Sequence, residues 1–168
     1  MDFTIKELRD NPSEIENAKA FLYGQIKKVY DIGPTPEFHY DIEGIKEYYI
    51  LPPRNTFFIA CDGDKIVATA AIRAYDKDYE FFRGEYTKEN TASIWRLMVD
   101  EDYRRHGLAR RLVNEMEDFA RKEGYTRIYL HTHRYLEAAL QFWEALGYEI
   151  TLEEDDYDET NHMVKVLV

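Results

Sequence analysis

The chain lacks several features that define large classes of protein. Among its 168 residues there is one cysteine, Cys61, so no disulfide can form within the chain. Its setting, "FFIACDGDK", favours a small buried side chain over a catalytic thiol. The longest nearly apolar run, "IVATAAI", is too short to cross a bilayer, and the first residues lack a signal-peptide pattern. We therefore expect a cytoplasmic protein with no membrane partner.

Positive charge is also scarce. The 22 Lys and Arg residues face 33 Asp and Glu residues, which gives a net charge of -11. Sequence-independent nucleic-acid binding depends on neutralising phosphates with basic side chains, so this balance argues against a nucleic-acid partner. Cationic or small neutral partners are favoured instead. The length and the 45% hydrophobic composition suit a single globular domain over residues 1–168.

Common catalytic and nucleotide-binding motifs are absent from the sequence. It contains no G-x-x-x-x-G-K-[ST], no G-x-G-x-x-G after a strand-like run, and no G-x-S-x-G nucleophile elbow. His131 and His133 resemble a metal-binding pair, but no third ligand is spaced with them. We therefore expect neither a metal site nor a nucleophilic serine.

Hydrophobic periodicity predicts alternating strands and helices. "CDGDK" holds the Asp62-Gly63 turn of a hairpin within residues 55–75, and Asn11, Pro12 and Ser13 read as the start of a helix. Strands are predicted at 3–8, on both sides of that turn, and at 91–99, 126–132, 148–152 and 162–168; helices are predicted at 11–31, 42–50, 107–122 and 135–146. Only the strand-helix-strand unit over 91–132 requires parallel pairing, so we predict an α/β fold with a mixed sheet.

The stretch "YRRHGLARRL", Tyr103 to Leu112, places four arginines around Gly107 where the third long helix begins. A helix N-terminus already carries partial positive charge, so each arginine there costs about 0.3–1 kcal/mol unless an anion is bound. Gly107 lets a bulky anion approach the backbone, which favours a phosphate or pyrophosphate ligand. The equal alternative is that the arginines pair with Asp100, Glu101, Asp102 and Glu115 as a solvated surface.

At this point the sequence resembles a known family. Arg104-x-x-Gly107-x-Ala109 matches the Q/R-x-x-G-x-G/A signature of the GNAT superfamily of acyl-CoA N-acyltransferases, and "ALQFWEALGYEI" resembles that family's later helix-to-strand segment. The resemblance implies a GNAT-like mixed sheet of about seven strands with helices on both faces, and acetyl-CoA as co-substrate without a metal. It implies these cofactor-binding residues: Leu97, Met98, Val99, Arg104, Arg105, His106, Gly107, Leu108, Ala109, Arg110 and Trp143.

The catalytic residues are less well defined by the resemblance. Direct acetyl transfer requires a base for the ammonium and an acid for the leaving thiolate. Many family members have a tyrosine acid where this chain has Trp143, which cannot protonate a thiolate. Tyr135 is our preferred substitute, with Tyr148 or a water as alternatives. For the base we name Glu85 and His133, although histidines at the end of a strand also have ordinary structural explanations.

We therefore expect an N-acetyltransferase that acts on a primary amine: a small amine, an amino-acid derivative or a peptide N-terminus. The alternative is a CoA-binding sensor or interaction module without turnover, as Trp143 suggests. The acidic segment "EEDDYDE" favours a cationic acceptor, or else is a solvated hairpin tip. An exposed sheet edge at "HMVKVLV" is compatible with a homodimer.

Overall fold

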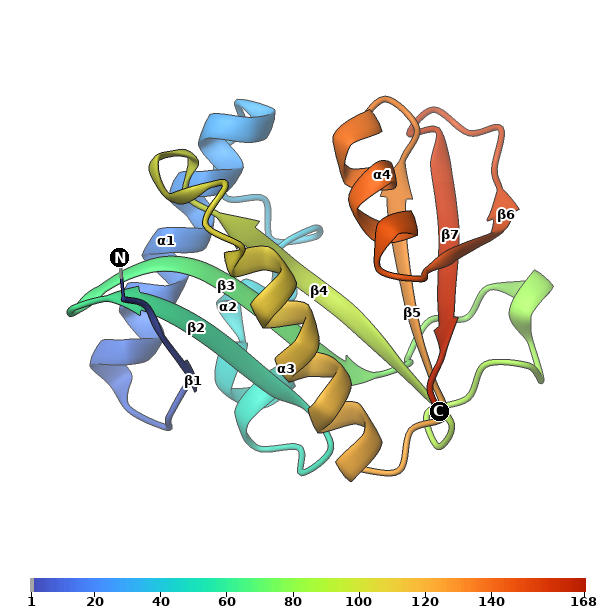
Figure 1. Ribbon diagram of the computed structural model, residues 1–168, viewed down its shortest axis with the longest axis horizontal. Helices are drawn as coiled ribbons and strands as arrows, with labels where there is room; N and C mark the ends of the chain where they lie inside the picture. The colour runs from blue at the N-terminus through green and yellow to red at the C-terminus, as the bar shows by residue number, and fades with distance from the viewer. Residues whose placement is uncertain (1) are drawn as a thin grey trace. The chain divides into compact units, whose positions relative to one another are not determined.

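A computed structural model describes residues 2–168 and shows a mixed α/β architecture (Figure 1). The seven strands form one sheet in the order β1-β2-β3-β4-β5-β7-β6, in which β4 and β5 are parallel. This confirms the predicted fold class. In chain order the elements are β1 Thr4–Glu7, α1 Pro12–Tyr30, α2 Tyr40–Glu43, η1 Lys46–Ile50, β2 Thr56–Asp62, β3 Lys65–Ala74, η2 Glu80–Phe82, β4 Thr91–Val99, η3 Glu101–Tyr103, α3 Leu108–Lys122, β5 Arg127–His133, α4 Glu137–Ala145, β6 Glu149–Glu153 and β7 Thr160–Val166.

The chain forms two compact units. The first consists of the chain up to Arg73 together with Trp95–Met116, and the second consists of Ala74–Ile94 together with Glu117–Val168. Strand β4 and helix α3 each contribute residues to both units. The single domain expected over residues 1–168 stays a prediction. Within residues 2–168, no helix combines the length and the apolar composition that crossing a bilayer requires.

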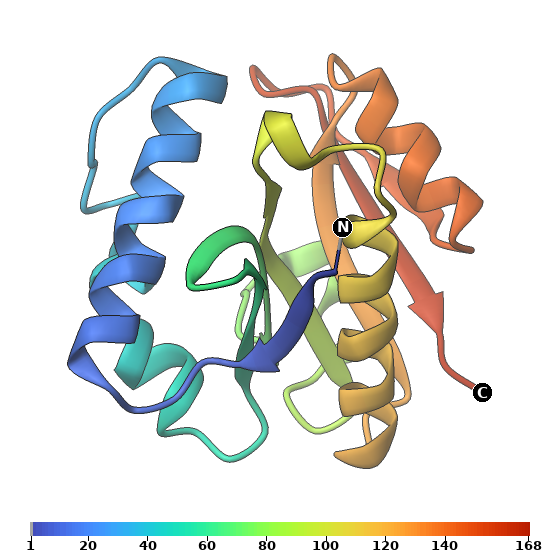
Figure 2. The same ribbon diagram turned by 60° about the vertical axis from the view of Figure 1, so that its left-hand side comes forward.

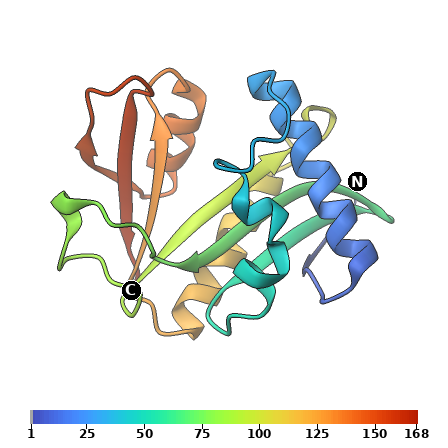
Figure 3. The ribbon, with the colours of Figure 1, turned by 180° about the vertical axis from the view of Figure 1, so that it is seen from behind.

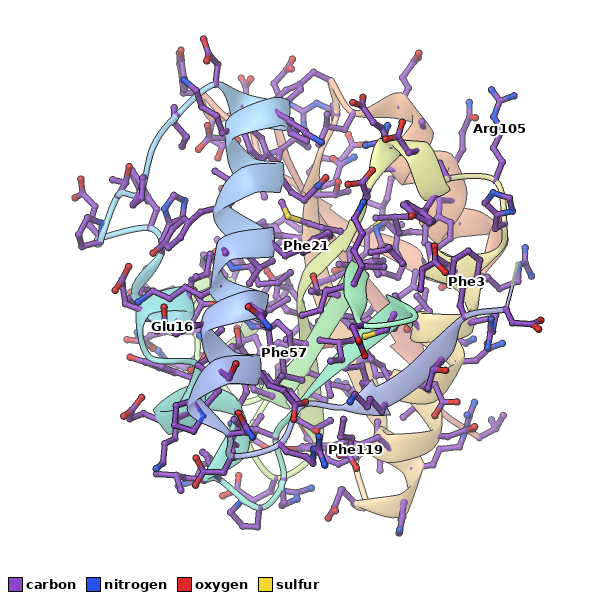
Figure 4. The ribbon with its side chains drawn as sticks, turned by 90° about the vertical axis from the view of Figure 1, so that its left-hand side faces the viewer. Phe3, Glu16, Phe21, Phe57, Arg105 and Phe119 are labelled. Atoms are coloured by element: carbon purple, nitrogen blue, oxygen red, sulfur yellow. The ribbon has the colours of Figure 1, made fainter. Side chains whose placement is uncertain are left out.

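The first unit is built on the antiparallel strands β1, β2 and β3. Helices α1 and α2 cover one face of β2 and β3, and the first half of α3 covers the other (Figures 2 and 3). The Asn11 side chain accepts hydrogen bonds from the backbone N–H of Ser13 and Glu14, which confirms the predicted start of α1. Leu22 and Phe57 are buried in the core of this unit, and Phe21 lies on the strand side of α1 (Figure 4).

The second unit is centred on β5. The first residues of β4 pair with β5 in parallel from Thr91 to Ser93, and β7 pairs with β5 in antiparallel fashion along its whole length. Helix α4 packs against β5 (Figure 1). A second hydrophobic core lies in this unit and consists of Tyr75, Phe82, Tyr86 and Tyr129. Buried aromatic side chains therefore anchor the polar loop after β3.

Two helix predictions need correction. The helix predicted over residues 42–50 is present but irregular: the α-helical turn α2 is followed after Gly44 by the π-helical turn η1, in which Leu51 N–H donates to the Lys46 carbonyl at 2.9 Å. Pro52 and Pro53 follow η1, where the sequence predicts the helix to end. Tyr135 does not belong to α4, because that helix begins at Glu137.

The predicted sheet edge is also wrong. Strand β7 lies inside the sheet, between β5 and β6, with His133 opposite Thr160 at one end of its ladder and Arg127 opposite Val166 at the other. The edge strand is β6, which follows α4 and turns back to pair with β7. The homodimer stays a prediction, and an exposed β7 edge can no longer be used to support it.

Candidate functional site

Strand β4 carries an unusual backbone conformation at its centre. Arg96 has φ 52°, in the left-handed region that residues with a Cβ rarely adopt. Its carbonyl accepts a hydrogen bond from the Thr69 hydroxyl at 2.8 Å, which helps to hold this conformation. The parallel ladder between β4 and β5 ends at Ser93, before this residue. The half-buried residues Leu97, Met98 and Val99 follow it, where the resemblance expects the strand to meet pantetheine.

The loop from η3 to α3 turns sharply at two residues. Arg105 has φ 68° and Gly107 has φ 76°. A Cβ built at Gly107 would have no atom within 4 Å, so open space lies in front of this backbone. The first backbone bond of α3 joins Arg111 N–H to the Gly107 carbonyl, so the N–H groups of Leu108, Ala109 and Arg110 have no acceptor within the helix. The loop therefore offers unpaired donors behind an unobstructed glycine.

The arginines around this glycine are exposed and unpaired. Within residues 2–168, no carboxylate lies within 4.0 Å of the guanidinium groups of Arg104, Arg105, Arg110 and Arg111. Asp100 instead approaches Lys28 at 3.9 Å and caps η3 through the Asp102 N–H. Figure 4 shows Arg105 extending outward from the loop. The ion pairs that the solvated-surface alternative requires are thus absent from the described chain, and an anion remains the natural partner of this cluster.

His106, the remaining residue of the loop, is exposed, and its ring lies 5.8 Å from the ring of Phe3. Phe3 also packs edge-on against Tyr103 at 5.9 Å, and the Tyr103 hydroxyl donates to Asp62 at 3.0 Å. These contacts connect the start of the loop to β1 and to the β2-β3 hairpin within the first unit. These contacts hold Tyr103 and His106 in place, and the arginine side chains of the loop remain exposed to solvent.

Trp143 lies in the second unit, on α4, and is only 6% exposed. Its ring packs edge-on against Tyr148 at 5.1 Å and against Phe142 at 5.0 Å. Tyr148 donates a hydrogen bond to the buried Glu117 at 3.0 Å, and burial with the nearby Glu117 charge raises the pKa of Tyr148 well above its usual value. Trp143 is therefore a core residue of its unit, and Tyr148 is engaged in an internal bond that disfavours a role as thiolate acid.

Tyr135 and His133 lie together at the end of β5. Their rings stack at 5.1 Å with an interplanar angle of 4°, and the His133 Nδ1 atom lies 2.8 Å from the Asp158 carbonyl oxygen. Tyr135 is 54% exposed. The structure thus brings two of the predicted catalytic residues into contact. Their roles in catalysis stay a prediction.

Glu85 is placed at the other end of the same strand. Its carboxylate lies 3.8 Å from the guanidinium of Arg127, the first residue of β5, whereas His133 is the last. At about 3.3 Å per residue, the length of β5 separates the two by roughly 20 Å. Glu85 and His133 therefore do not share one site, and Glu85 has an ion-pair partner that accounts for its position.

A buried ion pair in the first unit escaped the sequence analysis. Arg96 donates to both carboxylate oxygens of Asp41, at 2.7 and 3.0 Å, and Tyr49 donates to the same carboxylate at 2.7 Å. Burial alone would raise the pKa of Asp41, but the hydrogen bonds and charge of Arg96 hold this pKa below its ordinary value. The partners are 55 residues apart, and no local pattern links them.

A second buried polar chain lies in the second unit. His162 is fully buried, with Nδ1 2.6 Å from the Tyr129 hydroxyl and Nε2 3.0 Å from a Glu154 carboxylate oxygen. Burial lowers the pKa of His162, against the opposing effect of Glu154. Because a carboxylate only accepts hydrogen bonds, Nε2 carries the proton in the neutral ring and Nδ1 accepts from Tyr129. His131 is exposed, and its ring lies 6.5 Å from that of His162.

Within residues 2–168, no group of three or more His, Cys, Asp or Glu side chains is arranged to hold a metal ion.

The candidate site residues fall into two sets. The exposed arginine loop and the centre of β4 belong to the first unit, and the histidine pair, Tyr135 and Trp143 belong to the second.

Solved structures share this fold over nearly the whole chain. A GNAT-family acetyltransferase from Staphylococcus aureus Mu50 superposes with a TM-score of 0.77 at 20% identity, covering 99% of this chain and 100% of that one. The PaiA N-acetyltransferase from Thermoplasma acidophilum, solved in complex with coenzyme A, has a TM-score of 0.69 at 16% identity and covers 99% of both chains.

Curated relatives are N-acetyltransferases of greater length. N-acetylaspartate synthetase from Rattus norvegicus is 29% identical over 119 residues, which is 71% of this chain but only 36% of the relative. The chain therefore spans little more than a third of that protein. The model of the acetyltransferase (GNAT) family matches residues 22–148, which include β4, the arginine loop, β5 and α4. On this evidence the chain belongs to the acetyltransferase (GNAT) family.

Proposed function

We propose that this protein transfers an acetyl group from acetyl-CoA directly to a primary amine. The observation that carries the proposal is the loop at Gly107, where unpaired backbone donors and exposed, unpaired arginines surround an open approach. Such a cradle fits the pyrophosphate of coenzyme A, which would supply the acetyl thioester when bound. Arg104, Arg105 and Arg110 would neutralise the phosphates, and the N–H groups of Leu108 and Ala109 would hydrogen-bond to them.

The chemistry proposed for this site is balanced without an enzyme-bound intermediate. The acceptor ammonium first loses a proton to a base, and the free amine then forms a bond to the thioester carbonyl carbon. The carbon–sulfur bond breaks, and the thiolate takes up a proton. The exposed His131 and half-buried His133 are the bases we favour, and the exposed Tyr135, whose ring stacks on that of His133, is the acid we favour.

The acceptor class is an amino acid, a small amine or a peptide N-terminus. N-acetylaspartate synthetase is named for an amino-acid product, so aspartate is among the first acceptors to test. The acidic segment after β6 offers weaker support for a cationic acceptor than its composition suggests. Glu154 lies at hydrogen-bond distance from His162, and Asp156 accepts hydrogen bonds from Thr160, so both are committed to the fold.

Calorimetric titration of acetyl-CoA and coenzyme A into the protein tests the cofactor site. We expect saturable binding that Gly107→Glu weakens by at least about 100-fold, since the new carboxylate occupies the phosphate cradle and repels it. Gly63→Glu is the matched control, because Gly63 also has positive φ, 62°, with no atom within 4 Å of its Cβ position. Equal weakening by the two variants, or no binding by the wild type, would overturn the proposal.

The second candidate is a coenzyme A-binding module without turnover. It rests on Trp143 at the position where the family often has tyrosine. The buried packing of Trp143 against Tyr148 gives this residue a structural reason to be present, so its identity alone does not argue against catalysis. Release of the free thiol from acetyl-CoA in the presence of amines separates the two functions, since the module would bind acetyl-CoA and release none.

A further inference from the structure

The guanidinium of Arg96 is held rigidly at the centre of β4. Nε and Nη2 donate to the two oxygens of Asp41, and Nη2 also donates to the Phe38 carbonyl at 2.9 Å. Asp41 has no exposed surface, and the Tyr49 hydroxyl also donates a hydrogen bond to its Oδ2 atom. An arginine held at three points loses little conformational freedom when it binds a further group, so this side chain is pre-organised.

One nitrogen of this guanidinium is left open. Nη1 of Arg96 makes no hydrogen bond within residues 2–168, and it is not among the buried unpaired atoms, so solvent reaches it. The Arg96 side chain as a whole is 16% exposed. Its two Nη1 protons therefore point to a position that a ligand can occupy, although most of the side chain is covered.

The surroundings of this nitrogen favour a small organic acid. Phe38, whose carbonyl oxygen accepts a hydrogen bond from Nη2, is 65% exposed. Unpaired guanidinium N–H donors close to an exposed aromatic residue suit a carboxylate on an organic molecule better than a free inorganic ion.

We infer that Arg96, through Nη1, binds a carboxylate carried by the acceptor amine. The inference rests on the proposed function, and it narrows the acceptor to an amine that also carries a carboxylate, as an amino acid does. Arg96 directly precedes Leu97–Val99, the segment expected to meet the cofactor.

The test compares three acceptors that differ only in their acid groups: L-aspartate, L-asparagine and L-isoasparagine. The last two replace the side-chain and the main-chain carboxylate, respectively, with a neutral amide. We expect kcat/KM to fall about tenfold or more for one of the amides, the loss of one charge-assisted hydrogen bond. Equal kcat/KM for all three would overturn the inference while leaving the proposed acetyl transfer in place.

Variants then assign the preference to Arg96. Arg96→Lys keeps the charge beside Asp41 but removes the open Nη1 donor, so the preference for aspartate should fall about tenfold. Arg9→Lys is the matched control, because Arg9 also binds a carboxylate, that of Glu14 at 2.6 Å. The comparison of the three acceptors on the wild type remains an independent measurement if Arg96→Lys fails to fold. An unchanged preference in folded Arg96→Lys would overturn the assignment.

Failure of the proposed function has a different signature. In that case the wild type acetylates none of the three compounds, nor any other amine. The same compounds are then titrated into the protein saturated with coenzyme A. Binding of aspartate that weakens with Arg96→Lys and not with Arg9→Lys would support the carboxylate site on its own. Absence of binding by all three compounds would overturn it.

Discussion

Replacing Asp41 with asparagine tests whether the buried ion pair stabilises the fold. Asp41 is fully buried and the Arg96 side chain is only 16% exposed, so the variant leaves a mostly buried guanidinium without its counter-charge. Removing one partner of a buried pair costs about 3–5 kcal/mol. For a protein of this length, with a total stability of about 5–15 kcal/mol, that is a large fraction. We expect the Tm to fall by roughly 6–20 °C.

Urea denaturation followed by circular dichroism measures this change. The control is Asp78→Asn, which breaks a 3.0 Å ion pair with Arg83 between side chains that are 84% and 58% exposed. Such surface pairs contribute about 0–1 kcal/mol, so this variant should unfold almost like the wild type. Comparable losses below about 1 kcal/mol for both variants would refute the reasoning, because they would mean that burial does not strengthen the Asp41–Arg96 pair.

The pH dependence of the same measurement has a definite sign. The pKa of Asp41 is held below its ordinary value in the folded protein. The contribution of Asp41 to the free energy of unfolding is therefore fully present above the unfolded-state pKa of about 4. It is lost as the pH falls through the lower pKa of the folded state. The difference in unfolding free energy between the wild type and Asp41→Asn should accordingly shrink below about pH 4.

Two further predictions concern the second unit. Tyr148→Phe removes the hydrogen bond to the buried Glu117 but leaves in place the 3.0 Å ion pair between Glu117 and Lys165. Urea denaturation should therefore show that the free energy of unfolding falls by about 1–3 kcal/mol. For His162, burial lowers the folded pKa, so the unfolded chain binds an extra proton below about pH 6.5 and stability falls from pH 7 to pH 5. His162→Gln should flatten that pH dependence, and an equally steep profile in the variant would contradict the assignment.

Local chemistry made much of the fold predictable from the sequence. The Asn11 cap, the Asp62-Gly63 hairpin and the start of α3 after Gly107 depend on neighbouring residues, and the structure has each of them. The parallel pairing of β4 with β5 followed from the helix that connects them. Family resemblance then indicated where the cofactor loop should lie, and the exposed, unpaired arginines found there are consistent with it.

The main omissions share a physical cause, which is contact between residues far apart in the chain. Arg96 takes a left-handed conformation that its strand-like surroundings do not predict, and Asp41 meets it across 55 residues. The position of β7 inside the sheet depends on which neighbour pairs with it, and alternating hydrophobicity does not specify the neighbour. Glu85 and His133 both carry suitable chemistry, but only the length of β5 shows that they lie apart.

The strand order also bears on how the sheet avoids pairing with other chains. The outer strands are β1, only four residues long, and β6, which begins and ends with glutamate and has an irregular register between Ile150 and Leu152. Short length, like charges and a bulge each weaken the addition of a foreign strand. The hydrophobic segment that would template such addition, "HMVKVLV", lies largely within β7 and is hydrogen-bonded on both sides. The fold therefore keeps this hydrophobic strand off the sheet edge, and the acidic strand β6 pairs with it on its outer side.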